Sequence, residues 1–213
     1  MTGRTYSINE IFYSIQGEGM RAGTANVFVR FSGCNMECRM EPGPKSPGGF
    51  DCDTEFVSGR KFTAAELETE MSLAFGEGCA PGNGLDRWAV LTGGEPGLQF
   101  DADLLEFLHS KKWSIAIETN GSLELPSGID WVTVSPKVAE HALRQLVAHE
   151  VKYVRGYGQA IPRTRVEAKN KLLSPAHNGL DVDRKALDWC IKLIKENPEW
   201  RLSIQMHKAW LHR

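Results

Sequence analysis

The sequence lacks any uninterrupted apolar run approaching the roughly 20 residues that a helix needs to cross a bilayer. Its first residues, 1–7, also lack the apolar centre of a secretory signal peptide. Neither sign of charge is in excess, because 25 Lys and Arg residues nearly balance 27 Asp and Glu residues. The net charge of -2 therefore gives no polybasic footprint for nucleic acid or for a membrane surface. These absences predict a cytoplasmic protein that acts without nucleic acid or a membrane.

Cysteine is scarce and unevenly distributed. The chain has five cysteines, an odd number that argues against a secreted disulfide framework. Cys34, Cys38 and Cys52 lie in one early segment, whereas Cys79 and Cys190 stand alone and are not expected to bind metal. In a reducing compartment, a group of three cysteines is more typical of a metal site than of disulfides.

Segments with strand periodicity alternate with segments of helical periodicity along most of the chain. The 213 residues are enough for one domain, with at most a small second one, built around its own core. The alternation predicts a mainly parallel α/β sheet with functional residues at the carboxyl ends of its strands, but does not separate a barrel from an open doubly wound sheet. The expected strands are 26–31, 87–92, 114–119, 131–135, 150–154 and 200–206, and the expected helices are 63–75, 101–111, 138–148 and 183–196.

The stretch 155–181 interrupts this alternation, because it is rich in glycine, proline and basic residues. A solvated surface connection is the simpler interpretation, and a loop that binds an anionic ligand is the alternative. A short strand over 169–174 is also compatible with the pattern.

The spacing of the three early cysteines leaves two kinds of metal site open. Three residues separate Cys34 from Cys38, and thirteen separate Cys38 from Cys52. Three thiolates are one too few for a closed four-cysteine zinc or iron–sulfur site. A four-iron cluster with three ligands would leave one iron open to an exogenous group, whereas a zinc site would also need a histidine.

Five further motifs accompany the cysteines along the chain. Together they resemble the radical S-adenosylmethionine (SAM) superfamily and, within it, the 7-carboxy-7-deazaguanine synthase family. The resemblance extends from about residue 8 to residue 208 and is weakest over 155–182; each motif alone is modest evidence, but the ordered set is specific. The motifs are Glu-Ile-Phe-Tyr-Ser-Ile-Gln-Gly-Glu-Gly (10–19), Thr-Gly-Gly-Glu-Pro (92–96), Glu-Thr-Asn-Gly (118–121), Ser-Pro-Lys (135–137) and Gln-Met-His-Lys (205–208).

The resemblance implies the fold and reaction of that family. The fold would be an incomplete TIM barrel, a single radical SAM core domain over 1–213 with a cluster-loop insertion at about 39–51. Cys34, Cys38 and Cys52 would hold a 4Fe–4S cluster whose open iron chelates SAM, and reductive cleavage of SAM would give a 5′-deoxyadenosyl radical. That radical would take hydrogen from C6 of 6-carboxy-5,6,7,8-tetrahydropterin, and ring contraction with loss of ammonia would give 7-carboxy-7-deazaguanine, the chemistry of queuosine biosynthesis.

The resemblance also implies residues for SAM and for Mg2+. Gly93 and Gly94 lack a Cβ atom and so let the backbone approach a ligand closely. Thr54 matches the family's Mg2+ position, where an oxygen ligand suits this hard cation, and Asp53 is a second candidate. The full set implied for SAM is Asp53, Gly93, Gly94, Glu95, Glu118, Ser135, Lys137 and Gln205.

A second set of residues is implied for the pterin. Arg30 would bind the substrate carboxylate through its guanidinium, the alternative being a surface arginine paired with an acid. Glu118 and Asn120 end a strand and would read the amide and amino edge of the pterin. The resemblance adds Ile15, Gln16, Gly17, Glu18, Thr92 and His207 to this set.

Four features depart from the family pattern. The commoner spacing is Cys-x3-Cys-x2-Cys, so the thirteen residues after Cys38 form an insertion, and their prolines and glycines predict a non-helical loop. Lengthening this loop costs about 1.6 kcal/mol of closure entropy, whereas metal binding supplies on the order of 10 kcal/mol. Ile15 and Met206 replace the usual Leu and Thr, and residues 209–213 do not match the family's end, so Arg213 receives no substrate role.

Two other functions remain compatible with parts of the sequence. A radical SAM activase that makes a glycyl radical would share the cluster and the 92–96 turn, but would not account for 16–19 or 118–121. A zinc-stabilised binding module without catalysis would account for the cysteines alone. The leading interpretation also implies an external electron donor of the flavodoxin or ferredoxin type and a homodimer.

Overall fold

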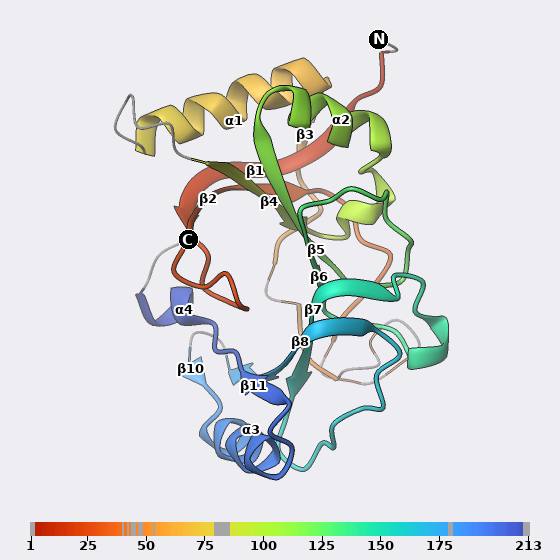
Figure 1. Cartoon of the computed structure of the whole chain (residues 1–213), viewed down its shortest axis with the longest axis vertical. Coiled ribbons are helices and arrows are strands. Elements are labelled where there is room, and N and C mark those ends of the chain that lie inside the picture. Colours follow the sequence, from red (N-terminus) through yellow and green to blue (C-terminus); the bar gives the residue numbers. More distant parts are fainter. Residues whose placement is uncertain are drawn as a thin grey trace.

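The computed structural model describes residues 3–39, 41, 43, 46, 49–52, 54–78, 86–178 and 181–210. A nine-stranded sheet dominates these residues, with the strand order β11-β8-β7-β6-β5-β4-β2-β1-β3 (Figure 1). Its strands are β1 (Tyr6–Ile15), β2 (Ala25–Phe31), β3 (Arg60–Phe62), β4 (Arg87–Gly93), β5 (Trp113–Thr119), β6 (Trp131–Val134), β7 (Val147–Arg155), β8 (Glu167–Pro175) and β11 (Trp200–Leu202).

Helices and short turns connect these strands. Figure 1 shows α1 and α2 near one end of the sheet and α3 beside β8 and β11 at the other. No helix of the described residues combines the length and apolarity that spanning a membrane requires. The remaining elements are α1 (Ala64–Gly78), η1 (Pro96–Leu98), α2 (Ala102–Ser110), η2 (Glu140–Ala142), α3 (Arg184–Glu196) and α4 (Met206–Trp210), with a separate two-stranded sheet of β9 (His177–Asn178) and β10 (Asp181–Val182).

The strands β2, β4, β5, β6, β7, β8 and β11 follow one another across the sheet in this order. Each of them pairs in parallel with the next, while β1 pairs antiparallel with β2 and β3 antiparallel with β1. Because parallel strands point the same way, the loops that follow β2, β4, β5, β6 and β7 all leave from the same edge of the sheet. This edge is where the motif residues of the sequence lie.

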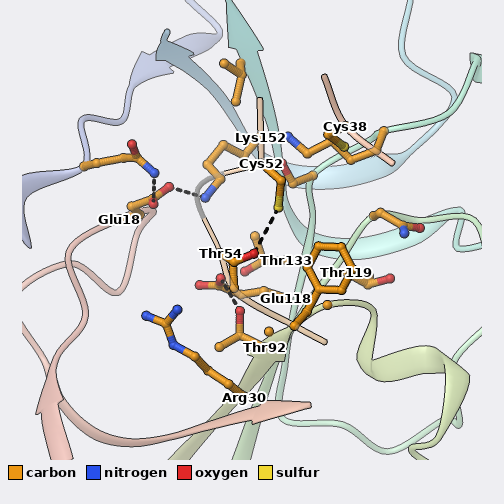
Figure 2. A pocket seen from close by; sticks show the side chains of 18 of the residues that line it. Glu18, Arg30, Cys38, Cys52, Thr54, Thr92, Glu118, Thr119, Thr133 and Lys152 are labelled. Carbon is orange, nitrogen blue, oxygen red and sulfur yellow. Dashed lines mark hydrogen bonds and ion pairs between the residues drawn. The ribbon is translucent and has the colours of Figure 1, made fainter. Parts of the chain in front are cut away.

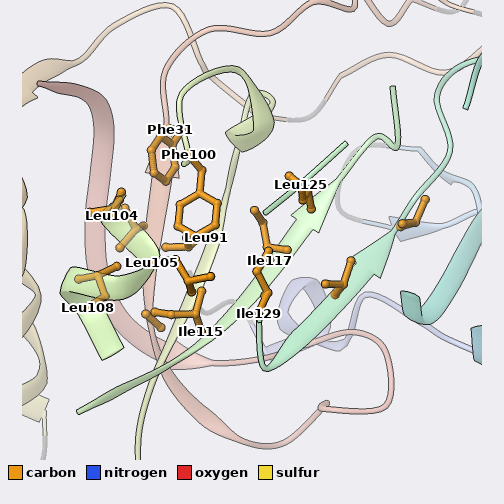
Figure 3. Packing of buried hydrophobic residues seen from close by; sticks show 14 of the residues in the cluster. Phe31, Leu91, Phe100, Leu104, Leu105, Leu108, Ile115, Ile117, Leu125 and Ile129 are labelled. Carbon is orange, nitrogen blue, oxygen red and sulfur yellow. The ribbon is translucent and has the colours of Figure 1, made fainter. Parts of the chain in front are cut away.

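Alternation along the strands separates a helix-covered core from a polar inner face. In β2, Val27, Val29 and Phe31 are fully buried, while Phe28 and Arg30 point to the other face. In the same way, β5 places Ile115 and Ile117 in the core. Figure 3 shows the core side, where residues of β4 and β5 pack against the buried leucines of α2, namely Leu104, Leu105 and Leu108. The period of two therefore decides which side chains face the functional cavity.

Most elements expected from periodicity are confirmed, and side chains cap three of the helices. The capping box before α1 is present: the Glu66 N–H donates to Thr63 Oγ1 at 3.3 Å, and the Thr63 N–H donates to Glu66 Oε2 at 2.7 Å. Asp101 and Asp183 cap α2 and α3 through their carboxylates. The largest omission is β1, whose buried residues Tyr6 and Ile8 alternate as a strand predicts.

The helix expected over 138–148 is wrong. Only the single turn η2 forms there, and β7 already begins at Val147. The backbone N–H groups of Arg144 and Gln145 both donate to the Gly121 carbonyl, at 2.9 and 3.2 Å, instead of to a preceding helical turn. Leu143, 1% exposed, anchors this extended stretch in the core. Tertiary contacts have overridden helix propensity here.

Two further boundaries differ from the prediction. The strand expected over 200–206 ends at Leu202. Further along, the Met206 N–H donates to the Gly17 carbonyl at 3.0 Å, and α4 begins at Met206. The stretch 155–181 contains the nine-residue strand β8, which is longer than the short strand expected over 169–174. Arg163 and Arg165 in this stretch are exposed, as a solvated connection predicts, whereas Arg155 lines the cavity described next.

Candidate active site

A cavity of about 680 Å³ opens at the carboxyl ends of the parallel strands. Figure 2 shows Arg30 on one side of it and Cys38 on the other, with Glu118 and Lys152 between them. Asp53 lies outside the described residues. The sequence-predicted site residues that line the cavity are Ile15, Gln16, Gly17, Glu18, Arg30, Cys34, Cys38, Cys52, Thr54, Thr92, Gly93, Gly94, Glu118, Asn120, Ser135, Lys137, Gln205 and His207.

The three clustered cysteines line one part of this cavity. Cys34 and Cys38 are half-buried and Cys52 is exposed. The Cys52 N–H donates to the Cys38 carbonyl at 3.2 Å, so the two ends of the thirteen-residue insertion meet at its base. The backbone N–H of Met36 donates to Cys34 Sγ at 3.4 Å. The loop therefore places all three cysteines in the lining of one cavity.

A glycine turn packs directly against the start of the cysteine loop. The Gly94 N–H donates to the Phe31 carbonyl and the Glu95 N–H to the Gly33 carbonyl, each at 2.9 Å. A Cβ atom on Gly94 would collide with the Gly33 carbonyl, and Gly93 has φ +109°, which side chains rarely adopt. Glycine is required here because two backbone segments are in contact.

Gly94→Ala is therefore expected to lower the free energy of unfolding by about 1–3 kcal/mol, the usual cost of overpacking. The midpoint of thermal unfolding should fall by about 2–4 °C for each kcal/mol. Gly76→Ala is a matched control, because Gly76 lies in α1 with open space where a Cβ atom would be placed. Equal melting temperatures for wild type and Gly94→Ala, measured by circular dichroism, would contradict the close packing.

Glu95 lies behind the cavity wall and is not one of the residues that line it. Its carboxylate is fully buried and accepts hydrogen bonds from Thr119 Oγ1 at 2.7 Å and from the backbone N–H groups of Asn120 at 2.7 Å and Gly97 at 2.9 Å. Burial raises its pKa in spite of these donors. Glu95 thus connects the glycine turn to the end of β5 and fixes the backbone of Asn120.

The loops after β5 and β6 are joined at the cavity edge. The Ser135 N–H donates to the Thr119 carbonyl at 2.8 Å, and the Lys137 N–H to the Asn120 carbonyl at 3.2 Å. The Asn120 side chain donates to Asn35 Oδ1 at 2.9 Å, which extends the network into the cysteine loop. The Ser-Pro-Lys and Glu-Thr-Asn-Gly motifs therefore form one surface beside the cysteines.

On the side of the cavity away from the cysteines, Glu118 is the central polar residue. Its carboxylate accepts from Gln16 Nε2 at 2.9 Å and from Thr92 Oγ1 at 3.2 Å. Arg30 approaches Glu10 with 3.6 Å between Nε and Oε2, beyond a hydrogen bond, and lies 5.4 Å from the centre of the Phe12 ring. Arg30 therefore lies near an acid, as expected for a surface arginine, but it also lines the cavity, as expected for a substrate-binding residue.

Several cavity residues were missed by sequence reasoning. Lys152 and Arg155 come from β7, and Thr133 comes from β6. The available signal was alternation: Val151 and Tyr153 of β7 are buried in the core, so Lys152 must face the opposite side with the other functional residues. Four aromatic lining residues were also missed, namely Phe12, Phe28, Phe50 and Phe56.

The mainly parallel sheet is that of a radical SAM partial barrel. A solved structure described as QueE from Escherichia coli is similar, with a TM-score of 0.65 and 25% sequence identity, over 94% of this chain and 93% of that one. No protein-family model matches the chain.

Curated relatives are similar over nearly their whole length. The 7-carboxy-7-deazaguanine synthase of Nitratidesulfovibrio vulgaris is 41% identical, with 96% of this chain and 97% of that protein aligned. Proteins of the same name from Caulobacter vibrioides and Bradyrhizobium diazoefficiens are 39% and 37% identical, each over 96% of this chain and 97% and 98% of their own. The chain belongs to the 7-carboxy-7-deazaguanine synthase family, and the resemblance found in the sequence is confirmed.

Proposed function

We infer that this chain is a radical SAM enzyme that converts 6-carboxy-5,6,7,8-tetrahydropterin to 7-carboxy-7-deazaguanine with loss of ammonia. The observation that carries this conclusion is the 41% identity to a protein of that name over 96% of the chain. The glycyl-radical activase and the zinc module each account for only part of the motif set, whereas this family accounts for all of it.

A 4Fe–4S cluster on Cys34, Cys38 and Cys52 is the first cofactor that we assign. All three residues line one cavity, and three thiolates would leave one iron of the cluster open to SAM. Burial raises the pKa of Cys34 and Cys38, and a bound cluster would stabilise their thiolates. When bound, the cluster and SAM would supply the radical chemistry of the reaction.

SAM and Mg2+ are assigned to the cysteine side of the cavity. Gly93, Gly94, Ser135 and Lys137 lie on the joined loops next to the cysteines, where backbone and side-chain polar groups are available for an amino acid moiety. The carbonyl of Thr54 lies 3.5 Å from Cys52 Sγ, so this residue would bring an oxygen ligand for Mg2+ close to the cluster. The remaining residues of the SAM set are Asp53, Glu95, Glu118 and Gln205, of which Glu95 would act through the backbone it fixes.

The pterin is assigned to the opposite side, between β1, β2 and β5. Arg30 would pair with its carboxylate, and the Glu118 carboxylate would accept hydrogen bonds from ring N–H and amino groups. Gln16 and Thr92 orient that carboxylate before substrate arrives. Phe12 and Phe28, whose rings stack with centres 5.2 Å apart, would exclude water from the same region. Ile15, Gly17, Glu18, Asn120 and His207 complete the proposed substrate set.

We further propose that the enzyme is a cytoplasmic homodimer with one core domain over 1–213, interrupted by the insertion at 39–51. An external donor of the flavodoxin or ferredoxin type would supply its electron. These assignments rest on the family alone, as does a place in queuosine biosynthesis.

The direct test is product formation under anaerobic conditions. The protein is reconstituted with iron and sulfide, reduced, and incubated with SAM, Mg2+ and 6-carboxytetrahydropterin. We expect 7-carboxy-7-deazaguanine by mass spectrometry, ammonia in equal amount, and no net consumption of SAM. Release of 5′-deoxyadenosine without pterin, with no deazapurine formed, would instead favour the activase. One tightly bound zinc and no iron would exclude both enzymes.

A further inference from the structure

A buried lysine on β7 is paired with the segment Gln16–Met20, whose first three residues line the cavity. The side chains of Lys152 and Glu18 are 9% and 14% exposed, and the Lys152 ammonium forms an ion pair with Glu18 Oε2 (Figure 2). We propose that Lys152 is a positioning residue, which holds Gln16–Met20 in its substrate-binding conformation through Glu18. The nature of the substrate rests on the function proposed above.

The charges around Lys152 explain why it is retained inside the protein. Burial by itself would lower its pKa, but the carboxylates of Glu18, Glu118 and Glu150 together raise the pKa well above its ordinary value. Burial would likewise raise the pKa of Glu18, yet Lys152 and the amide of Gln205 hold that pKa below its ordinary value. Lys152 is thus a cation among three acids, and its removal would leave like charges facing one another.

The segment Gln16–Met20 is held by hydrogen bonds from two directions. From β7, Glu150 accepts the Met20 N–H at 2.8 Å. From the chain after β11, Ser203 Oγ accepts the Gly19 N–H at 2.9 Å and Gln205 Nε2 donates to Glu18 Oε1 at 2.8 Å. Glu18 joins the contacts from both sides. One of its carboxylate oxygens binds Lys152 of β7, and the other accepts a hydrogen bond from Gln205.

Glycine at position 19 is part of the same arrangement. Gly19 has φ +72°, and a Cβ atom on it would collide with the carboxylate of Glu150. The segment therefore lies directly on β7, and its conformation depends on the side chains that β7 presents.

The position of Glu18 is transmitted to the pterin side by a short chain of hydrogen bonds. The Glu18 N–H donates to Gln16 Oε1 at 3.1 Å, and Gln16 Nε2 donates to Glu118 Oε1 at 2.9 Å. Displacement of Glu18 would therefore misalign the carboxylate of Glu118. The cysteines and Arg30 have no part in this chain of bonds. Loss of Lys152 should accordingly weaken pterin binding and leave cluster assembly intact.

The test compares Lys152→Met, which removes the charge at similar size, with Lys152→Arg, which keeps it. Lys169→Met is the matched control, because Lys169 is an exposed lysine of the neighbouring strand β8. Binding of 6-carboxypterin, an oxidised form that does not turn over, is measured by fluorescence, together with KM, kcat and iron content. Hydrogen exchange of the peptide covering residues 16–22 is measured without any ligand.

In Lys152→Met we expect the Kd for 6-carboxypterin and the KM to rise at least about 10-fold, since an unpaired buried carboxylate perturbs its surroundings. Peptide 16–22 should exchange faster, while kcat changes less than KM and iron content stays at the wild-type level. Lys152→Arg should bind the pterin within about 3-fold of wild type, because it keeps a cation that can reach Glu18. Lys169→Met should match wild type in every measurement.

Unchanged pterin affinity and exchange in Lys152→Met would overturn the proposal, as would equal losses in Lys152→Met and Lys152→Arg. Faster exchange throughout the protein would also overturn it, since that indicates a purely structural role. If Lys152→Met does not fold, Glu18→Gln breaks the same pair from the other side and should give the same signature. A wild type that neither binds 6-carboxypterin nor forms product would refute the proposed function, while exchange of residues 16–22 would still decide whether Lys152 holds the segment.

Discussion

Replacing Cys34, Cys38 or Cys52 by alanine is expected to abolish the iron–sulfur cluster and, with it, all product formation. Each of the three residues lines the cavity, and a cluster with one open iron has no spare protein ligand. Because metal binding contributes on the order of 10 kcal/mol, loss of one thiolate cannot be offset by the remaining contacts. Iron and sulfide analysis with the anaerobic absorption spectrum gives the result directly.

Cys190→Ala is the matched control for these three variants. Cys190 is 0% exposed on α3, and burial raises its pKa to about 11, so it is a neutral and inert thiol. This variant should keep a full complement of iron. Cys79 lies outside the described residues, and the sequence alone predicts that Cys79→Ala also keeps the cluster. Retention of the cluster in Cys52→Ala would contradict the ligand assignment.

The second large effect is expected at Arg30. Arg30→Gln should raise the Kd and KM for the carboxylated pterin by about 10- to 100-fold, because a hydrogen bond between charged groups contributes about 1.5–3 kcal/mol. The Kd and KM of Arg30→Lys should lie between those of wild type and Arg30→Gln, because lysine keeps the charge but cannot form the bidentate hydrogen bonds of arginine. Isothermal titration with 6-carboxypterin measures the affinities, with Arg201→Gln as a control at an exposed arginine of β11.

A pterin without the 6-carboxylate makes this prediction specific. Wild type and Arg30→Gln should bind that compound with the same weak affinity, because the group that Arg30 recognises is missing. If Arg30→Gln weakens both ligands equally, Arg30 does not read the carboxylate. In that case its approach to Glu10 and the Phe12 ring would be its main role, as the surface interpretation holds.

Local periodicity was sufficient to predict the elements whose two faces differ strongly. The segment 26–31 alternates between fully buried residues and residues that face the cavity, so its register follows from the sequence. The same is true of α2 and α3, whose apolar residues form one stripe and whose caps are aspartates. Motif residues at strand ends were predicted to meet because parallel strands end at one edge.

Contacts between distant segments could not be predicted in this way. Residues 143–145 have a helical composition, but the Gly121 carbonyl and the core decide their conformation. In the sequence, Lys152 looks like any other lysine of a strand. Its partner Glu18 lies 134 positions away in the chain, and only the fold brings the two together. Glu95 belongs to a recognised motif, yet only the structure shows that its carboxylate lies behind the cavity lining and accepts hydrogen bonds from Thr119 and Asn120.

The hydrogen bond between the Cys52 N–H and the Cys38 carbonyl has an evolutionary consequence. It closes the base of the insertion, so the spacing of the two sulfur-bearing residues is independent of how much chain lies between them. We therefore expect relatives to differ in the length of this loop while both cysteines still line the cavity.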